Sequence, residues 1–360
     1  GFGDPPRRIR PRRAVLAVAA LLVLISIPTY VLTRDATQLR ALSTGEALAV
    51  VADATLEAPA PRGNQFLYTR GENSFQAGYG SGGRDPLGRP VREFSKLLRT
   101  RFDSWISPGR CGLSRQEQIG EPTYPTERDR IRAERMEESE RIYRERINRK
   151  RRAAGKQPLP AFPDLFGENG ASVMQVPKTV RQATHVGGEK LSRRELRKFP
   201  TEPRAIYNRI KRSTSVSEGR SPSGVRGGRS PDFRVWNAVV STLAFGTQDL
   251  PRELRAGMIR TLGIIPGVRS LGEVDSQGRK GTGFSRSNSG QLVTIVFDQE
   301  TGIAISSRAE LAAPGRGRHE GWPVGTVIHE FVLFERKLVD DLPPDLKPTV
   351  KVGGFGDCGK

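Results

Sequence analysis

Two acidic residues lie close together between two apolar runs in the C-terminal third of the chain. In the stretch IVFDQETGIAI, Asp298 and Glu300 are two positions apart. Paired carboxylates can act as general acid and base, but only where their surroundings separate their pKa values. Here the flanking runs alternate like strands, Asp favours the first position of a turn, and Gly302 can supply the positive φ at its exit. The pattern therefore predicts a hairpin corner with two solvated acids rather than a catalytic pair.

His329 is the other residue whose type could support catalysis or metal binding. It opens the stretch HEFVLFE, which lacks the second histidine of an H-E-x-x-H zinc site. Its alternation with Val327 and Phe331 places all three on one face of a strand, where a hydrogen-bonded structural histidine is the more common case.

The chain has two cysteines, Cys111 and Cys358. Two are too few for a structural zinc site, although they could pair in an oxidising compartment.

The sequence contains none of the motifs that usually carry catalysis. No G-x-S-x-G nucleophile elbow, Walker A loop or H-E-x-x-H pair occurs. The glycine-rich stretch 78–83 is not flanked by an apolar strand and a helix, as a phosphate-binding loop would be. We therefore expect a non-enzymatic protein without catalytic residues, cofactor or metal site, and we keep an unrecognised hydrolase as the alternative.

The net charge of the chain indicates the kind of partner it could attract. Its 59 Lys and Arg residues against 39 Asp and Glu leave a formal charge of +20 at pH 7. Such an excess attracts polyanions, which include nucleic acid, anionic lipid headgroups and acidic wall polymers. The charge is densest in residues 126–152, and bases dominate the end of that segment. The candidates for contact with an anionic surface are Arg141, Arg144, Arg146, Arg149, Lys150, Arg151, Arg152 and Lys156.

The charged segment 126–152 has the composition of a solvent-exposed helix. Its Glu–Arg spacings predict the pairs Glu137–Arg141, Glu140–Arg144 and Glu145–Arg149, each worth about 0.2–0.5 kcal/mol. Its apolar residues do not form a continuous stripe, so we expect the helix to project into solvent. Two interpretations remain: an arm that grips an anionic surface, or a solvated helix without a partner, which is the commoner meaning of a charge run.

The N-terminal region carries the most specific pattern in the sequence. Residues 14–32 contain no formally charged side chain and are rich in Leu, Val, Ala and Ile. A helix of that length covers about 29 Å, which matches the roughly 30 Å hydrocarbon core of a bilayer. Arginines crowd residues 7–13, so the positive-inside rule places the N-terminus in the cytoplasm and the rest of the chain outside. We expect a single-pass protein of the cell membrane.

A cleaved secretory signal is the alternative explanation of residues 14–32. The apolar run of such a signal is usually about 7–15 residues long and ends at a small-x-small cleavage site. This run is longer and continues into VLTRDATQL without an Ala-x-Ala boundary, so the anchor is favoured. The chain begins at Gly1, which leaves open an upstream cytoplasmic piece.

Beyond residue 33 the hydrophobic pattern predicts an α+β fold. A capping box at Ser43 and Glu46 predicts a helix, and from residue 267 onward the apolar period changes to two. We therefore expect an N-terminal transmembrane helix followed by an extracytoplasmic antiparallel β-sheet packed with helices. The predicted segments are a basic cytoplasmic tail (1–13), the transmembrane helix (14–32), a juxtamembrane helix with the first strands (33–124), the charged helix with a Pro/Gly linker (125–200), helices followed by a β-meander (201–345) and a tail (346–360).

Several blocks of the sequence resemble an actinobacterial family of single-pass membrane proteins of unknown function, often encoded near extracytoplasmic-function sigma factors. The blocks are QFLYTR, KFPTEPRAIYNRI, LPRELRAGMIRTLGIIPGV and IVFDQETGIAI, and the resemblance extends from the N-terminus almost to Pro344. This chain departs from the family pattern at SPGR (107–110) and in its more heavily charged segment 126–152. The resemblance implies envelope sensing or regulation and carries over no site residue. More distantly, the order of elements is similar to lipoprotein-carrier-like half-barrels, which implies a groove between sheet and helices.

Three functions follow from these observations. The first is a non-enzymatic envelope protein with a sensing or regulatory role, receiving an envelope lipid or a regulatory protein partner in the half-barrel groove. The second is a basic adaptor that binds anionic lipid or wall polymer through residues 141–156. The third is an unrecognised hydrolase. Nucleic acid is disfavoured as a partner because the predicted topology puts the basic mass outside the cytoplasm.

Overall fold

The computed structural model describes most of the chain after residue 41. The described ranges are 42–59, 62–79, 85, 87–89, 94–158, 171–176, 184–187, 189–218, 230–245, 250–288, 290–315 and 319–348. The predicted cytoplasmic tail 1–13, the predicted span 14–32 and most of the predicted tail 346–360 lie outside these ranges. Among the helices in these ranges, none combines the length and the apolar character needed to cross a bilayer.

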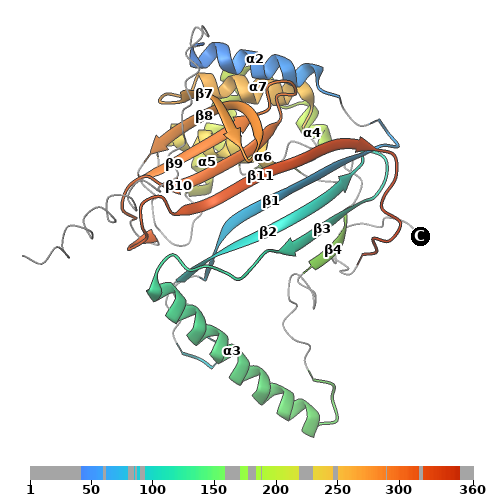
Figure 1. Cartoon of the computed structure of the whole chain (residues 1–360), viewed down its shortest axis with the longest axis vertical. Helices are drawn as coiled ribbons and strands as arrows, with labels where there is room; N and C mark the ends of the chain where they lie inside the picture. Colours follow the sequence, from blue (N-terminus) through green and yellow to red (C-terminus); the bar gives the residue numbers. More distant parts are fainter. Residues whose placement is uncertain are drawn as a thin grey trace, which may run out of the picture. The chain divides into compact units, whose positions relative to one another are not determined.

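One antiparallel sheet of nine strands forms the centre of the fold, in the order β4-β3-β2-β1-β11-β10-β9-β8-β7 (Figure 1). β11 pairs with both β1 and β10, so the last strand joins the N-terminal strands to the C-terminal meander. The predicted α+β class with an antiparallel sheet is thus confirmed. The strands are β1 (Phe66–Tyr79), β2 (Phe94–Ile106), β3 (Gly112–Gln118), β4 (Ala171–Val176), β7 (Arg269–Ser276), β8 (Arg279–Asn288), β9 (Gln291–Phe297), β10 (Ala304–Leu311) and β11 (Val327–Val339).

The helices and one small hairpin complete the described structure. The hairpin consists of β5 (Thr184–Val186) and β6 (Glu189–Leu191). The helices are α2 (Thr44–Glu57), α3 (Glu127–Ala153), α4 (Arg193–Arg197), α5 (Pro203–Glu218), α6 (Pro231–Phe245) and α7 (Arg252–Gly263). The predicted capping box begins α2: Ser43 Oγ accepts from the Glu46 amide, and the Glu46 side chain accepts from the Ser43 amide.

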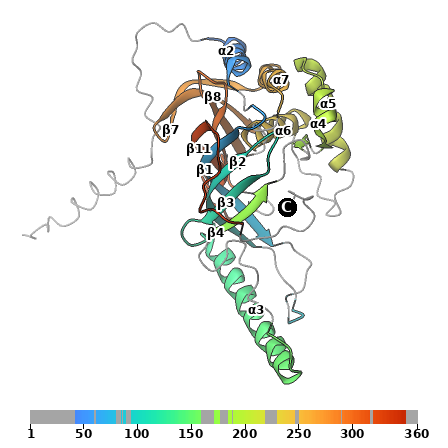
Figure 2. The same cartoon turned by 90° about the vertical axis from the view of Figure 1, so that its right-hand side faces the viewer.

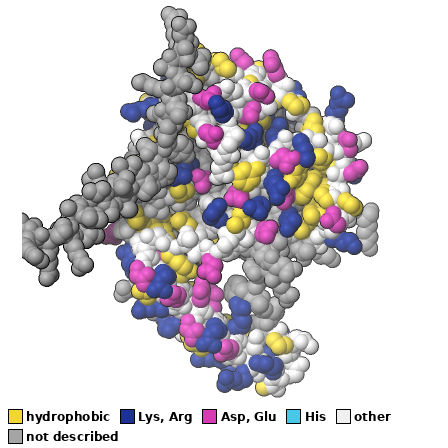
Figure 3. Space-filling model, viewed as in Figure 1, with side chains coloured by type: hydrophobic (Ala, Val, Ile, Leu, Met, Phe, Trp, Pro, Cys, Tyr) yellow, Lys and Arg dark blue, Asp and Glu magenta, His cyan; other side chains and the backbone are white. Residues whose placement is uncertain are grey.

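Helices cover one face of the sheet, and α3 leaves the domain at its far end. Figure 2 shows α4, α5 and α6 on one side of the sheet, and both views place α2 and α7 at the end opposite α3. On the other face, cross-strand ion pairs such as Glu72–Arg101 and Arg308–Glu330 connect neighbouring strands. In Figure 3 charged side chains of both signs run along α3. The sheet therefore carries a helical layer on one face, while the other face bears these ion pairs and a smaller apolar cluster around Phe66, Trp105 and Leu113.

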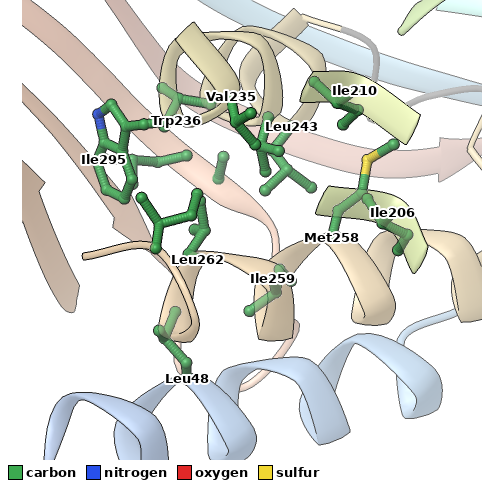
Figure 4. Packing of buried hydrophobic residues seen from close by; sticks show 14 of the residues in the cluster. Leu48, Ile206, Ile210, Val235, Trp236, Leu243, Met258, Ile259, Leu262 and Ile295 are labelled. Carbon is green, nitrogen blue, oxygen red and sulfur yellow. The ribbon is translucent and has the colours of Figure 1, made fainter. Parts of the chain in front are cut away.

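The main hydrophobic core lies between strands β8–β10 and the helices α2, α5, α6 and α7 (Figure 4). Trp236 of α6, Ile295 of β9 and Leu262 of α7 are completely buried. The residues Leu254, Met258 and Leu262 lie four positions apart on one side of α7, and all three are buried. Burying each such side chain is worth about 1.5–3 kcal/mol, so this layer supplies most of the packing energy of the domain.

Two features of the sheet were not expected from the sequence. β1 runs for 14 residues, well past the apolar stretch QFLYTR at 65–70, because it pairs along its length with β2. β4 adds a strand beside β3 although it lies in the stretch 125–200, which was expected to hold the charged helix and a linker. A six-residue strand inside a Pro/Gly-rich stretch leaves little trace in the sequence.

Candidate functional site

The predicted corner at Asp298 is confirmed, but this carboxylate is not freely solvated. Its Oδ1 accepts hydrogen bonds from the amide of Glu300 at 3.1 Å and from the amide and hydroxyl of Thr301 at 2.9 and 2.8 Å. Its Oδ2 accepts from Arg279 at 3.0 Å. Burial raises the pKa of Asp298, but the bonds from Thr301 and Arg279 outweigh it, so the pKa lies below its ordinary value. Glu300 stays exposed, and the two acids do not act as a pair.

The same corner fixes α2 onto the sheet. The Thr55 hydroxyl of α2 donates to the Gly302 carbonyl at 3.1 Å. Gly302 has a φ of +60°, and a Cβ at this position would lie 2.0 Å from Thr55 Oγ1. Only glycine meets both requirements without strain. The block IVFDQETGIAI therefore has a structural role: it turns the chain and docks a helix.

His329 lies on the helical side of the sheet beside aromatic rings. Its imidazole centroid is 5.0 Å from that of Phe245 at the end of α6. Burial lowers the pKa of His329, although a hydrogen bond to the Ser74 carbonyl and the charge of Glu330 act in the opposite sense. Nε2 is buried without a hydrogen-bond partner, so the histidine is only partly satisfied. Glu330 pairs with Arg308 instead, and across the described ranges no three His, Cys, Asp or Glu side chains gather as metal ligands would.

The eight predicted anionic-surface residues all lie on α3 or directly after it. Arg141 is neutralised, because it pairs with Glu138 at 2.7 Å and with Glu145 at 2.6 Å. The predicted pairs Glu137–Arg141 and Glu145–Arg149 are therefore wrong: the guanidinium reaches one acid three residues back and one four residues ahead. Arg144 lines a depression of about 270 Å³ together with Glu137 and Glu140, so acids surround it as well.

The other six bases form a separate group at the free end of α3. This distal cluster contains no acid between its first and last members, and its side chains are exposed except that of Arg151, which is partly buried and donates to the Gln157 carbonyl at 2.7 Å. None of the six forms an ion pair with another described residue. The distal cluster consists of Arg146, Arg149, Lys150, Arg151, Arg152 and Lys156.

The first half of α3 is fixed to the sheet by buried hydrogen bonds. Thr126 caps the helix by accepting from the Asp129 amide at 3.1 Å. Asp129, only 3% exposed, accepts from the Ser95 amide of β2 at 3.1 Å. The Ser139 hydroxyl, 0% exposed, donates to the carboxylate of Asp85. These contacts hold residues 126–139, and we call them the joint of α3.

A chain of hydrogen bonds extends the joint to the loop before β11. The Gln76 amide donates to Ser95 Oγ at 2.7 Å, and its Oε1 lies 3.1 Å from His319 Nε2. The His319 ring packs against that of Trp322, with ring centroids 4.6 Å apart and the planes tilted by 54°. Serine, histidine and aspartate are thus close together, but Gln76 separates the imidazole from the Ser95 hydroxyl and all three are buried. The arrangement is a rigid connection rather than a nucleophile with its base.

The sequence offered a faint signal for the joint. The spacing of Thr126 and Asp129 is that of a capping residue and its third helical position. Ala133 and Ser139 are the small residues in a run of long charged ones, and both are buried. Small residues inside a charged helix mark the side on which a helix approaches its neighbour, although they do not identify that neighbour.

Two further features bear on the site. A surface depression of about 460 Å³ is lined by Arg70, Arg101, Phe334 and Glu335. Arg70 and Arg101 pair with acids on neighbouring strands, so the charge of this depression is balanced.

Cys111 takes part in a disulfide. The other cysteine of the chain, at position 358, lies outside the described ranges.

Comparisons with known proteins returned no relative. No protein-family model matches the sequence, no curated protein matches it, and no solved structure matches its fold. The resemblance to an actinobacterial membrane family stays a prediction, and function has to be argued from the geometry of the chain itself.

Proposed function

We propose that this chain is a non-enzymatic, membrane-anchored protein of the cell envelope that binds an anionic polymer outside the membrane. The contact is the distal cluster of α3. One observation carries the proposal: six bases without an acid occupy the free end of a helix whose other end is fixed by buried hydrogen bonds. Residues 14–32 are the proposed anchor.

A rigid arm is a favourable way to present such charge. α3 has 27 residues, which corresponds to a length of about 40 Å. Its joint ends at Ser139, so roughly half of the helix stands clear of the buried contacts. Bases held on a preformed helix lose less conformational entropy on binding than bases on an unstructured tail. Arg146, Arg149 and Lys150 share one face, at the i, i+3 and i+4 spacings of a helix.

The distribution of charge argues against a helix that is merely solvated. The first part of α3 mixes acids and bases, as in the pairs of Arg130 with Glu127 and Glu134. In the distal cluster, Arg146 faces Lys150 at i+4, and like charges at this spacing destabilise a helix by about 0.2–0.5 kcal/mol. The C-terminal end of the helix dipole offsets this repulsion, because it stabilises cations in the last turn, here Lys150, Arg151 and Arg152, by about 0.3–1 kcal/mol each. The helix end is therefore stable with its bases unpaired and available to a polyanion.

The position of α3 favours a polymer over the lipid of the anchoring membrane. α2 begins twelve positions after the last residue of the proposed anchor, a connection that spans at most about 43 Å. α3 lies at the opposite end of the domain from α2 (Figures 1 and 2). The disulfide of Cys111 supports an oxidising location, which disfavours nucleic acid as the polyanion.

The half-barrel groove receives less support as a lipid site. Over β8–β10 the sheet packs directly against α6, and Phe284, Ile295 and Phe297 have no exposed surface. A lipid chain would have to displace core side chains there, at a cost of several kcal/mol. The hydrolase alternative gains nothing from Asp298 and His329, whose contacts are structural.

Binding to cell-wall material tests the proposal. The full chain in detergent would be sedimented at low salt with purified sacculi, before and after hydrofluoric acid removes their phosphodiester-linked polymers. The triple variant R146Q/R149Q/K150Q should bind at least about ten-fold more weakly. The matched control R194Q/R197Q/K198Q removes the same charge from α4 and its C-cap, where Arg194, Arg197 and Lys198 are also exposed, and should bind within about two-fold of the unmodified chain. Equal losses in the two triples would contradict the proposal.

Topology is checked separately. Reporter fusions after residues 12 and 60 should give a cytoplasmic and an extracytoplasmic signal respectively. A cytoplasmic signal from the second fusion would remove the envelope location and bring nucleic acid forward as the polyanion.

A further inference from the structure

The depression of about 460 Å³ on the sheet has walls of opposite charge. Its volume falls within the roughly 300–1,000 Å³ that is usual for small-ligand sites. Two guanidinium groups, a carboxylate and a phenyl ring line it, and we call these four residues the bipolar site: Arg70, Arg101, Glu335 and Phe334. Charge that is balanced but separated does not attract a polyanion as the distal cluster does, so this site suits a ligand that carries both signs of charge.

The strand register sets a guanidinium against a carboxylate. β1, β2 and β11 are neighbours in the sheet (Figure 1), and Arg70 of β1 is directly opposite Glu335 of β11. Such residues have Cβ atoms about 4.5–5.5 Å apart. Although both lie in the described part of the chain, no ion pair joins them: Arg70 pairs with Asp103 and Glu335 pairs with Lys337. The two opposite charges are therefore held apart, and both line the depression.

A β-bulge in β11 adds the apolar wall of the bipolar site. The pairs Arg70–Glu335 and Gly71–Leu333 skip Phe334, which has no opposite residue on β1. The extra residue of a bulge interrupts the alternation of side chains and redirects one of them. Phe334 thus lines the depression beside Glu335, where regular alternation would have turned it to the opposite face of the sheet.

The two arginines keep hydrogen-bond donors for a ligand. Arg70 Nε lies 3.7 Å from Asp103 Oδ1, which is an ion pair but too long for a hydrogen bond. Arg101 donates from Nη2 to Glu72 Oε1 at 2.9 Å, and a guanidinium has five donors in all. The two side chains are 47% and 41% exposed. They occupy diagonal positions of neighbouring strands, a spacing that long side chains bridge, so one carboxylate can accept from both.

We infer that the bipolar site binds a small zwitterion of peptide chemistry, either a free amino acid or the end of a short peptide. The ligand's carboxylate lies between Arg70 and Arg101, its amine at Glu335, and an apolar side chain against the Phe334 ring. The site is built from β1, β2 and β11 and uses no residue of the distal cluster. The inference therefore goes beyond the proposed function and does not depend on it.

Isothermal titration of the full chain in detergent tests the inference with defined peptides. Alanylphenylalanine carries both charges, its N-acetyl derivative lacks the amine, and its C-terminal amide lacks the carboxylate. Each blocked peptide should bind at least about five-fold more weakly than the parent, because it loses a charge-assisted hydrogen bond. Free phenylalanine distinguishes the two sources: tighter binding of the dipeptide assigns the site to a peptide end, and equal binding assigns it to an amino acid.

Substitutions assign each charge of the ligand to its partner. R70Q should weaken the binding of alanylphenylalanine at least about three-fold. E335Q should make the parent peptide and its N-acetyl derivative bind alike, because the amine then has no acidic partner. R115Q is the matched control: Arg115 is 42% exposed and lies opposite Asp103 in the same row of the sheet, but does not line the depression. It should change binding by less than about two-fold.

Three results would overturn the inference: no binding of alanylphenylalanine by the unmodified chain, blocked peptides that bind as tightly as the parent, or an equal loss in R70Q and R115Q. The variant R146Q/R149Q/K150Q separates the bipolar site from the distal cluster. It should bind the dipeptide as the unmodified chain does, even where its binding to wall polymer is lost. Weaker dipeptide binding in this variant would place the site on α3 and also overturn the inference.

Discussion

α2 and α3 are both capped helices, yet they relate to the rest of the protein in opposite ways. α2 has 14 residues, and its buried residues include Leu48, Val51 and Ala52. α3 has 27 residues and buries only Asp129, Ala133 and Ser139, all within its first half. Apolar packing holds α2, whereas a few hydrogen bonds at one end hold α3. The length of a helix therefore says little about how firmly it is attached, and an attachment confined to one end leaves the other free to bind.

The two kinds of attachment differ in strength. A fully buried leucine contributes about 1.5–3 kcal/mol, whereas a typical hydrogen bond contributes about 0.5–1.5 kcal/mol net. α2 makes its contacts along its whole length, and the Thr55–Gly302 bond adds a fixed point on the sheet. We expect α2 to unfold with the core and α3 to detach before it.

The largest expected effect comes from a cavity under α2. Leu48→Ala removes a side chain that is 1% exposed and should destabilise the protein by about 2–5 kcal/mol. Leu56→Ala on the same helix, where the side chain is 37% exposed, should cost less than about 1 kcal/mol. Thermal denaturation of the full chain in detergent, followed by circular dichroism, measures both. Similar losses in the two variants would mean that α2 is not held by its buried face.

A second effect should appear at the joint without reaching the core. Ser139→Leu removes the hydrogen bond to Asp85 and places a larger side chain where the present one is 0% exposed. Hydrogen exchange should accelerate in residues 127–139, while the melting temperature changes by only a few degrees. Exchange that accelerates equally in α2 would show that the two helices unfold as one unit.

The joint should also respond to acid. Burial raises the pKa of Asp85, but hydrogen bonds from Ser139, Arg89 and Leu87 outweigh it and lower the pKa to about 2. A depressed pKa means that the stabilisation is fully present above the unfolded value of about 3.9 and is lost as the pH falls toward 2. The protection factors of residues 127–139, which correct exchange rates for the intrinsic pH dependence of amide exchange, should therefore fall between pH 4 and 2.

A neutral substitute at the same position provides the control for the acid response. Asp85→Asn cannot titrate, so the protection factors in the first half of α3 should be lower at pH 6 than in the unmodified chain and nearly independent of pH below 4. An unchanged acid response in this variant would assign the titration to another carboxylate.

The smallest expected effect comes from breaking the ion pairs of Arg141 in the middle of α3. Arg141→Gln breaks the pairs with Glu138 and Glu145, whose side chains are mostly exposed, so stability should fall by less than about 0.5 kcal/mol. The two released glutamates lie next to the distal cluster and should weaken polymer binding slightly. Isothermal titration with polyphosphate as the probe compares this variant with the unmodified chain. A loss as large as that of R146Q/R149Q/K150Q would shift the binding site toward the middle of the helix.

Features encoded by near neighbours could be predicted from the sequence. The cap at Ser43, the buried stripe of α7 and the Asp298 corner each depend on residues within a few positions of one another. The alternating pattern after residue 267 likewise predicted the meander strands. Local periodicity and turn chemistry were sufficient in these cases.

Features that depend on distant partners could not be predicted. Ser139 bonds to Asp85, 54 residues away, and His319 to Gln76, 243 residues away. The pairing of β4 with β3 crosses the whole of α3. The ion pairs of α3 were mispredicted for a different reason: i,i+3 and i,i+4 partners compete for one guanidinium, and spacing alone does not decide which of them it contacts. The acid-free run from Arg146 to Lys156 can be read from the sequence, but that the acids of the helix pair with Arg141 and Arg130 and not with the distal cluster required the structure.

The salt dependence of polymer binding tests the central claim most directly. The full chain, R146Q/R149Q/K150Q and R194Q/R197Q/K198Q would each be titrated with soluble wall polymer over a series of salt concentrations. If the distal cluster holds the polymer, the slope of log K against log salt should become shallower by about 2–3 in the α3 triple and stay unchanged in the α4 triple. Equal slopes in all three proteins would contradict the account, because the binding charge would then lie elsewhere on the chain.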